Sequence, residues 1–450
     1  MQDLIAAQRA YFLQGATRPY SARIKALQAL YDGIIAHQSL IEDALKQDLN
    51  KSSFEAYATE VGFCLHSIRQ TMKHLRKWMR KKKIKTPFYH LFTRSYTRFE
   101  PLGQVLIIGP YNYPFQLVIE PLIGALAAGN TVIVKPSEFP SATEKAVQTV
   151  LEHVFQPEMV AVVIGGVEVT TALLKERFDH IFFTGSTRVG KIVYEAAAKH
   201  LTPVTLELGG KSPAIIDKDV KMNVAARRIA FGKWINAGQT CVAPDYLLVH
   251  RDVETTLIDA LTETLKTFYP HDTEDFGHII NHQHFNRLNQ LIDPEKVAYQ
   301  GKVLADKRLM GPIILRDVDW NDAVMQEEIF GPILPIIPYD RIEDVLEILK
   351  TKEKPLALYV FSQNKQFSQA IFDTLSFGGG AINDTITQVA NWYLPFGGVG
   401  SSGIGSYHGH ASFATFSHKK AWVRKGTRLD PKLIYPPYGK KEKLIRRILR

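Results

Sequence analysis

The chain has 450 residues, of which 45% are hydrophobic and 22% are charged, and its formal net charge is +10. This length exceeds one ordinary hydrophobic core, so we expect at least two domains, and the composition excludes a disordered or fibrous protein. Two cysteines, Cys64 and Cys241, cannot build a disulfide framework and are typical of a reducing compartment.

Neither the N-terminus nor the most apolar segment predicts membrane insertion. Residues 1–15 have no basic leader and no sustained apolar core, so they do not read as a signal peptide. The stretch LVIEPLIGALAAGNTVIV (117–134) is interrupted by Glu120, Gly129 and Asn130, which predicts a helix, a turn and a strand. We therefore expect a soluble, cytoplasmic protein.

Positive charge is concentrated in residues 73–85 and in the tail 440–450. Basic patches can bind nucleic acid, but neither segment contains a recognisable nucleic-acid module, so no nucleic-acid partner is expected. In the tail, one helical face is apolar (Leu444, Ile445, Ile448, Leu449) and basic residues surround it (Lys441, Lys443, Arg446, Arg447, Arg450). This pattern predicts a short helix that either contacts an anionic membrane surface or docks on the protein or a partner subunit.

The periodicity of apolar residues changes along the chain. Residues 1–80 repeat apolar positions every three or four residues and predict helices. Short apolar strands bounded by Gly and Pro then alternate with helical segments; we expect them at 103–110, 130–136, 159–166, 180–185 and 202–210. A second alternating set includes 213–217, 246–250, 333–339 and 356–362. The pattern predicts two α/β domains with buried parallel sheets, joined near residue 210.

Cys241 lies in the polar turn NAGQTCVAP (236–244), whereas a structural cysteine usually lies in an apolar run. Chance placement in a loop and a functional thiol both remain open on this observation alone. Cys64, in VGFCLHSI, follows a helical apolar pattern and is predicted to be a core thiol.

Two glycine-containing turns differ in whether they fit a phosphate. The G-x-G-x-x-G match at Gly398, Gly400 and Gly403 follows no strand and opens no clear helix, so it reads as a tight turn. In FFTGSTRVGK, by contrast, Gly185 and Ser186 connect a strand to a helix, and the positive end of that helix can hold an anion.

Other polar side chains follow strands or stand in loops. Lys135 and Glu138 in VIVKPSE lie just past a strand, where α/β folds bind ligands. Glu207 ends an apolar strand in VTLELGGKSP, where burial disfavours its charge. Asn112 in IGPYNYPF is placed to donate a hydrogen bond to an oxyanion. MQEEIFGP carries Glu328 and Phe330 before a Gly-Pro turn.

Together, and in this order, these motifs resemble one family. The chain resembles NAD(P)-dependent aldehyde dehydrogenases, through seven strings: PYNYPF, VKPSE, FTGSTRVGK, LELGGKSP, NAGQTCVAP, EEIFGP and PFGGVGSSGIG. The short N-terminus and GQTCVAPDY are most similar to the class 3 branch, which acts on fatty and aromatic aldehydes and is commonly dimeric.

The resemblance implies a mechanism for the catalytic motifs. Cys241 is the nucleophile that adds to the aldehyde, and Asn112 with the Cys241 N–H holds the oxyanion. Hydride passes to the nicotinamide and leaves a thioester, and Glu207 is the general base for the water that hydrolyses it.

The resemblance also implies how the dinucleotide is held. Lys135, Ser137 and Glu138 lie at the adenosine ribose, whereas Gly185, Ser186 and Val189 lie near the pyrophosphate. Glu328 binds the nicotinamide ribose, with Phe330 beside the ring. The expected cofactor is NAD, with NADP possible, because a carboxylate at Glu138 accepts from a ribose 2′-hydroxyl and repels a 2′-phosphate.

The implied architecture is a Rossmann-like cofactor domain, a second α/β catalytic domain and a bridging segment. We expect residues 1–82 and 102–209 in the cofactor domain, 210–410 in the catalytic domain, and 83–101 with 411–450 in the bridging or oligomerisation segment and basic tail. A homodimer is the expected assembly.

Two functions other than a hydrolytic aldehyde dehydrogenase are possible for such a sequence. A CoA-acylating dehydrogenase would pass the acyl group to a thiol and would not need Glu207 as a base. A non-catalytic relative is disfavoured by the presence of Asn112, Glu207 and Cys241 together.

Two further sets of residues have alternative interpretations. His278, His282 and His284 lack zinc-like spacing and acidic companions, so we expect a polar surface segment and no metal. Phe231 and Trp234 either line an aldehyde channel or belong to the core.

Overall fold

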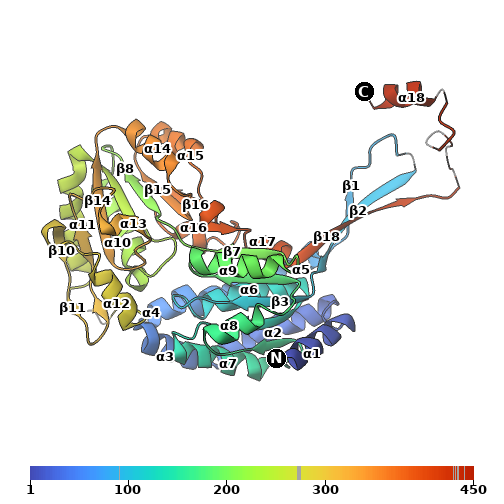
Figure 1. Ribbon diagram of the computed structural model, residues 1–450, viewed down its shortest axis with the longest axis horizontal. Coiled ribbons are helices and arrows are strands. Elements are labelled where there is room, and N and C mark those ends of the chain that lie inside the picture. Colours follow the sequence, from blue (N-terminus) through green and yellow to red (C-terminus); the bar gives the residue numbers. More distant parts are fainter. Residues whose placement is uncertain are drawn as a thin grey trace.

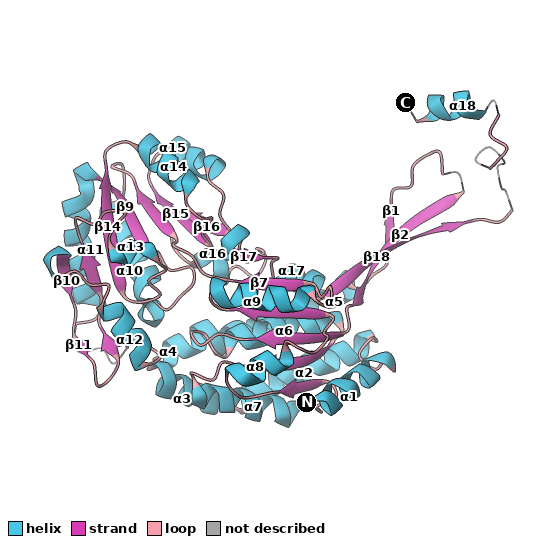
Figure 2. Ribbon diagram, viewed as in Figure 1, coloured by secondary structure: helices cyan, strands magenta, loops and turns pink. Residues whose placement is uncertain are grey.

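The computed structural model describes residues 1–90, 92–270, 275–428, 430, 432, 435–439 and 441–449. Two α/β bodies lie side by side, and a narrow three-stranded sheet projects away from them (Figures 1 and 2). The predicted α/β fold with two parallel sheets is confirmed.

The N-terminal region is helical, as predicted. Its elements are α1 (Gln2–Leu13), α2 (Tyr20–Ala36), α3 (Gln38–Leu49), α4 (Ser53–Ala56), a single π-helical turn (Tyr57–Val61) and α5 (Gly62–Trp78). The apolar stripe of α5 is buried and includes Cys64, which is fully buried as expected of a core thiol. These helices pack against α6 (Gln116–Ala128) and α7 (Ser141–Val154) of the first body.

The first body is built on a six-stranded sheet with the order β17-β7-β6-β3-β4-β5. Five strands are parallel: β3 (Gln104–Ile108), β4 (Thr131–Lys135), β5 (Val160–Val162), β6 (His180–Thr184) and β7 (Val204–Glu207). Their side chains are almost all buried, because helices cover both faces. The connecting helices include α8 (Val167–Leu173) and α9 (Thr187–Ala198).

The C-terminal part of the chain returns to this first sheet. β17 (Gly403–Ile404) pairs antiparallel with β7, and α17 (Gly409–Thr415) packs on α6 and α5. The glycine-rich turn before β17 contains a 3-10 turn (Gly400–Ser402) and lies against backbone: a Cβ on Gly398 would be 2.1 Å from the carbonyl oxygen of Ser402. This segment is therefore a tight structural turn, as the sequence indicated.

The second body contains a seven-stranded sheet with the order β10-β13-β14-β9-β8-β15-β16. Its strands are β8 (Pro213–Ile216), β9 (Tyr246–His250), β10 (Val297–Gln300), β13 (Ile313–Leu315), β14 (Ile333–Tyr339), β15 (Ala357–Phe361) and β16 (Gly379–Ile382). Only β10 runs antiparallel to its neighbour. β11 (Val303–Leu304) and β12 (Leu309–Met310) form a separate small ladder.

Helices complete the second body. They are α10 (Met222–Trp234), α11 (Glu254–Phe268), α12 (His282–Asn289), α13 (Ala323–Gln326), α14 (Ile342–Thr351), α15 (Lys365–Thr374) and α16 (Thr387–Ala390). Short 3-10 turns lie at Ile235–Gly238, Arg251–Val253 and Pro294–Lys296. The turn at Ile235–Gly238 leads directly into the cysteine loop.

The projecting sheet has the order β1-β2-β18, formed by β1 (Lys82–Ile84), β2 (Thr93–Pro101) and β18 (Ser417–Lys425). It joins two segments that are far apart in the chain and leaves much of its surface exposed. The last helix, α18 (Lys441–Ile448), lies apart from the two bodies (Figure 1). Among the helices described, none is long and apolar enough to cross a membrane.

Candidate active site

The order of the first sheet brings the predicted polar residues to one edge. β7, β6, β3 and β4 are neighbours and parallel, so their carboxyl ends meet at the same edge. Glu207 ends β7 and Lys135 ends β4, whereas Asn112 lies in the loop after the central strand β3. Ligands bind at this edge in open α/β sheets.

The loop that carries Cys241 has an unusual backbone. Asn236, Ala237 and Gly238 have φ values of 53°, 52° and 73°, which is the left-handed region. A Cβ on Gly238 would lie 2.2 Å from the carbonyl oxygen of Gly331, so only glycine fits there. Such a run of strained residues persists only where the surroundings hold it, and it is common at functional sites.

Hydrogen bonds hold this loop against the loop after β3. The Asn112 amide donates to the carbonyl oxygen of Gln239 at 3.0 Å, and the Asn236 amide donates to the carbonyl oxygen of Asn112 at 2.8 Å. The hydroxyls of Tyr113 and Thr240 are 2.6 Å apart. The structure thus brings Asn112 to the cysteine loop, as the sequence motifs predicted.

A buried ion pair supports the same loop, and no sequence motif pointed to it. Lys51 and Glu60 are paired with no exposure of either side chain. The second carboxylate oxygen of Glu60 accepts from the N–H groups of Phe115 and Gln116, at 2.9 and 3.0 Å. The Lys51 ammonium also lies 3.9 Å from the centre of the Tyr113 ring.

Glu207 is the most isolated acid of the site. It is 2% exposed, and neither of its carboxylate oxygens has a hydrogen-bond partner among the residues described. Burial raises the pKa of this carboxyl well above its usual range. A buried carboxyl with a raised pKa is a stronger base than an exposed one, which is the property that a general base requires.

Cys241 is partly buried and its thiol is not in a disulfide. Burial raises the pKa of the thiol, and the carboxylates of Glu328 and Glu207 raise it further. The backbone N–H groups of Cys241 and Val242 act in the opposite direction. The site therefore needs a base to remove the thiol proton, because the thiolate is the nucleophile.

Glu328 lies against the glycines that follow β7. A Cβ on Gly209 would be 1.9 Å from its Oε2, so a side chain at that position would displace the carboxylate. Burial, aided by the charge of Asp245 and opposed by the Gly210 N–H, raises the pKa of Glu328 to about 8. Phe330 has a φ of 50°, and its ring centre is 5.7 Å from that of Tyr111.

Lys135 is directed toward the strand end by two short contacts. Its side chain is buried, and Nζ lies 2.6 Å from the carbonyl oxygen of Pro136 and 3.2 Å from Oε2 of Glu138. An ammonium has three donors, so one remains for a ligand hydroxyl. Ser137 is buried beside it and accepts weakly from the Phe139 N–H.

The turn from β6 to α9 fits an anion. Ser186 is the N-cap of α9, and its hydroxyl accepts from the Val189 N–H at 3.4 Å. A Cβ on Gly185 would lie 2.6 Å from the ring of Phe183. The helix start leaves N–H groups without intrahelical partners, which suits the pyrophosphate of the expected dinucleotide.

A cleft of about 660 Å³ separates the two bodies beside this turn. Thr187 of α9, Gly209, Gly210 and Glu328 contribute to its lining. The cleft therefore connects the start of α9 with Glu328. One Lys135 N–H is left to donate to a hydroxyl of the expected cofactor. The Glu207 oxygens are buried without partners among the described residues and can accept a proton from a reacting group. The residues present therefore fit both.

The predicted polar surface holds for part of the histidine segment: His282 is exposed, and His278 and His284 are half-buried. The residues around His278 differ, because 276–280 are mostly buried and brace the cysteine loop: Gln239 donates to the carbonyl oxygen of His278 and accepts from the Ile280 N–H. The apolar residues Ile279 and Ile280 are buried, and the spacing of the histidines did not predict this. In the part of the chain that the structure describes, no group of His, Cys, Asp or Glu is arranged for a metal.

The two aromatic residues upstream of Cys241 differ from one another. Trp234 is 1% exposed and its indole N–H donates to the carbonyl oxygen of Pro332 at 2.8 Å, so it is a core residue. Phe231 is 49% exposed on the same helix and belongs to the surface.

Comparisons with known proteins agree with this site. The family model described as "Aldehyde dehydrogenase family" matches residues 1–422. A protein named 4,4'-diaponeurosporen-aldehyde dehydrogenase, from Staphylococcus aureus, is 47% identical over 443 residues, which is 97% of this chain and 96% of that protein. A protein named "aldehyde dehydrogenase, dimeric NADP-preferring", from Canis lupus familiaris, is 44% identical over 97% of this chain and 98% of its own.

Solved structures give the same result for the fold. The substrate-bound state of Staphylococcus aureus AldH aligns with a TM-score of 0.98 at 46% identity, covering 100% of this chain and 99% of that one. A Mycobacterium tuberculosis aldehyde dehydrogenase in complex with NAD+ aligns with a TM-score of 0.83 at 27% identity, covering 93% and 88%. By sequence and by fold, this chain belongs to the aldehyde dehydrogenase family, whose members oxidise aldehydes to carboxylic acids with NAD(P).

Proposed function

We propose that this chain oxidises apolar aliphatic or aromatic aldehydes, with Cys241 as nucleophile, Glu207 as general base and Asn112 as oxyanion donor. The observation that supports this most is the buried carboxyl of Glu207, neither oxygen of which has a hydrogen-bond partner among the described residues. Burial of a carboxyl without hydrogen bonds is costly and is explained by a reaction that uses it.

The steps follow from the positions of these groups. Glu207 takes the thiol proton, and the Cys241 sulfur adds to the aldehyde carbon. The oxyanion that forms accepts from the Cys241 N–H and from the Asn112 amide, which exchanges its bond to Gln239 for this one. Bound NAD(P)+ supplies the acceptor for the hydride.

The second half of the reaction releases the acid. The acyl group is now a thioester on Cys241. Glu207 releases the thiol proton to solvent and is then free to remove a proton from the water that attacks the thioester carbon. The carbon–sulfur bond breaks, the carboxylic acid leaves and the thiol is restored. A CoA-acylating reaction would end with a thiol in place of water and would leave the isolated Glu207 carboxylate without a use.

The cofactor residues are proposed from the same edge of the sheet. Lys135, Ser137 and Glu138 would hold the adenosine ribose, and the turn with Gly185, Ser186 and Val189 would hold the pyrophosphate. Glu328 would bind the nicotinamide ribose with Phe330 beside the ring. This set is supported by the spare Lys135 donor, the α9 N-terminus and the position of Glu328 against Gly209.

Organisation beyond the site is also proposed. Residues 1–82 and 102–209 would form the cofactor domain, 210–410 the catalytic domain, and 83–101 with 411–450 the bridging segment and tail. The projecting sheet exposes a surface for a second copy, and the dog relative is named as dimeric, which supports a homodimer. A cytoplasmic location is consistent with the two unpaired cysteines.

The tail is proposed to touch an anionic membrane surface. α18 is a short helix with Arg446 and Arg447 in its last turn, and the side chains of Ile445 and Ile448 are partly buried. The predicted contributions of the Leu444 side chain and of Arg450 lie outside the described residues. Eight helical residues bury little apolar area, so attraction to anionic lipid must contribute much of the binding.

The experiment that tests the enzyme assignment is aldehyde-dependent reduction of NAD(P)+, measured with and without CoA. We expect turnover without CoA, and its loss in Cys241→Ser with cofactor binding retained. Cys64→Ala is the matched control, since it removes the other cysteine from the core and should keep turnover. A strict requirement for CoA would favour the acylating reaction, and no turnover with any aldehyde would favour a non-catalytic relative. A profile across aliphatic chain lengths and aromatic aldehydes identifies the preferred substrate.

A further inference from the structure

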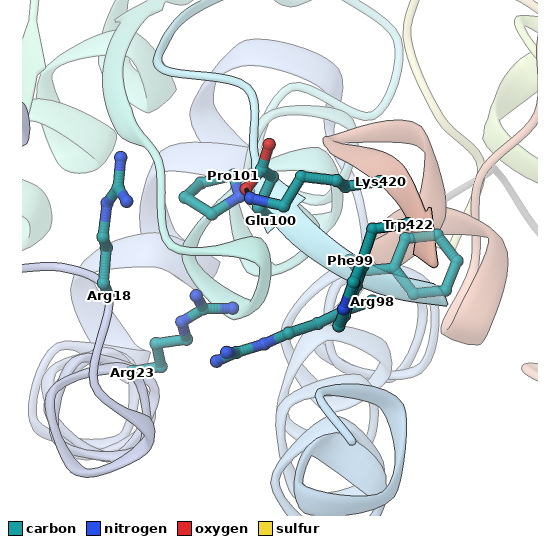
Figure 3. A pocket seen from close by; sticks show the side chains of 8 residues that line it. All are labelled: Arg18, Arg23, Arg98, Phe99, Glu100, Pro101, Lys420 and Trp422. Atoms are coloured by element: carbon teal, nitrogen blue, oxygen red, sulfur yellow. Dashed lines mark hydrogen bonds and ion pairs between the residues drawn. The ribbon is translucent and has the colours of Figure 1, made fainter. Parts of the chain in front are cut away.

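A second pocket lies where the projecting sheet meets the N-terminal helices, and the proposed mechanism does not use it. Its volume is about 410 Å³. Its lining comes from the start of α2 and from β2 and β18: Arg18, Arg23, Arg98, Phe99, Glu100, Pro101, Lys420 and Trp422 (Figure 3). Four of these residues are cationic and one is acidic.

Arg23 is the buried member of the set. It is 5% exposed, and its Nη1 donates to the carbonyl oxygen of Ala127 at 3.0 Å, at the end of α6. Its Nε is buried without a partner among the described residues. Burial, together with the charges of Arg98 and Arg18, lowers the pKa of Arg23 to about 10. The site therefore holds like charges close together in a partly desolvated place.

Arg98 and Arg18 add exposed guanidinium groups to the same pocket. Figure 3 shows the side chains of Arg23 and Arg98 extending toward one another from α2 and β2. Within the described ranges, no carboxylate forms an ion pair with any of the three arginines. The pocket's single acid, Glu100, is paired with Lys420, and that hydrogen bond is the main reason why its pKa is lowered. The three arginines thus have no ion-pair partner in the described part of the chain.

The rest of the lining is apolar. Trp422 shares a face of the sheet with Arg98 and presents aromatic surface, and its ring is fixed by Tyr96 at 5.6 Å between ring centres. The ring of Phe99 lies on the other face and packs on Phe413 at 5.3 Å. Pro101 is buried at the end of β2. A planar fork of guanidinium donors matches a phosphate or a carboxylate, and an aromatic wall adds affinity for an apolar substituent.

We propose that this pocket binds a phosphate-bearing molecule with an apolar or aromatic substituent, with Arg23, Arg98 and Arg18 as its anion ligands. The phosphate can belong to a small soluble molecule or to the headgroup of an anionic lipid, since both present the same oxygens. The proposal does not depend on the roles of Cys241 and Glu207.

The test uses the full chain with saturating NAD+, so that the pyrophosphate site is filled. Inorganic phosphate, phenyl phosphate and vesicles with or without phosphatidic acid are titrated, with calorimetry for the soluble probes and co-sedimentation for the vesicles. We expect one saturable site per chain, tighter for phenyl phosphate than for inorganic phosphate. Arg98→Ala should weaken binding by about tenfold or more.

Arg94→Ala is the matched control, because Arg94 is exposed on the same strand and does not line the pocket. It should change affinity less than twofold. Arg18→Ala provides a second exposed variant, so the result does not depend on the folding of one protein. Binding of vesicles alone, lost in Arg98→Ala, would assign the lipid headgroup as the source of the phosphate. The proposal is overturned if no probe binds or if Arg94→Ala and Arg98→Ala have the same affinity for the probes. It is also overturned if Arg98→Ala changes only the oligomeric mass, because an acidic side chain of a second copy would then fill the pocket.

Discussion

Substitution of Lys51 by Met removes one partner of the buried pair that supports the Asn112 loop. Glu60 would keep its bonds to the Phe115 and Gln116 N–H groups but lose its cationic partner, at a position without solvent exposure. Breaking a fully buried ion pair in this way costs about 3–5 kcal/mol. We therefore expect a clear fall in the urea midpoint of unfolding.

The same substitution should lower kcat. The Lys51 ammonium contacts the Tyr113 ring, and the Tyr113 hydroxyl meets Thr240, next to Cys241. A small displacement of reacting groups costs up to about a hundredfold in rate. We expect kcat to fall at least tenfold while KM for the cofactor changes little, because Lys135 and the α9 turn are not part of this network.

Two further variants separate charge from packing. Lys46→Met changes an exposed lysine of α3 and should alter stability by no more than about 0.5 kcal/mol. Lys51→Met with Glu60→Gln removes both charges and keeps an acceptor for the two N–H groups, so it should recover much of the lost stability and rate. The reasoning is refuted if Lys51→Met matches Lys46→Met in both midpoint and kcat, or if the double variant is worse than Lys51→Met alone.

Three other predictions concern the cofactor, a buried acid and the tail. Glu138→Gln should lower the ratio of kcat/KM for NAD over NADP about tenfold, because a carboxylate repels a 2′-phosphate; an unchanged ratio would remove Glu138 from the ribose. Burial raises the pKa of Glu120 to about 7, so between pH 4.5 and 7 the folded chain keeps a proton that the unfolded chain releases, and stability falls by about 3 kcal/mol as pH rises through this window. Glu120→Gln should lack that loss, so its urea midpoint of unfolding should rise relative to that of the natural chain between pH 5 and pH 8. Parallel pH profiles of the two midpoints would contradict this prediction. A chain that ends at Gly439 should sediment less with anionic vesicles at low salt, and the difference should vanish at high salt; equal sedimentation of both chains would exclude the tail as the contact.

Local patterns predicted much of the fold. The strands from β3 to β9 were marked by apolar runs between Gly and Pro, because buried parallel strands need continuous apolar sequence. The clustering of Asn112, Lys135 and Glu207 was predictable from the motifs, since parallel neighbouring strands place their ends together. The return of β17 to the first sheet was not predictable, because a two-residue strand has no periodicity.

Long-range contacts explain what the sequence did not predict. The Lys51–Glu60 pair depends on a π-helical turn and on burial by α6, neither of which leaves a pattern in the sequence. The burial around His278 was not predicted, because Phe276, Ile279 and Ile280 are buried by contacts with segments that are distant in the sequence. The arginine pocket joins residues 18 and 420, and only pairing of β2 with β18 brings them together.

The central claim is that Glu207 is the base for release of the acid from Cys241. Rapid mixing of Glu207→Gln with saturating aldehyde and NAD+ tests it most directly, with NADH absorbance recorded from the first milliseconds. The account predicts a burst of about one NADH per active site followed by slow turnover, because the acyl group then stays on the sulfur. A steady-state rate equal to that of the natural chain would contradict it.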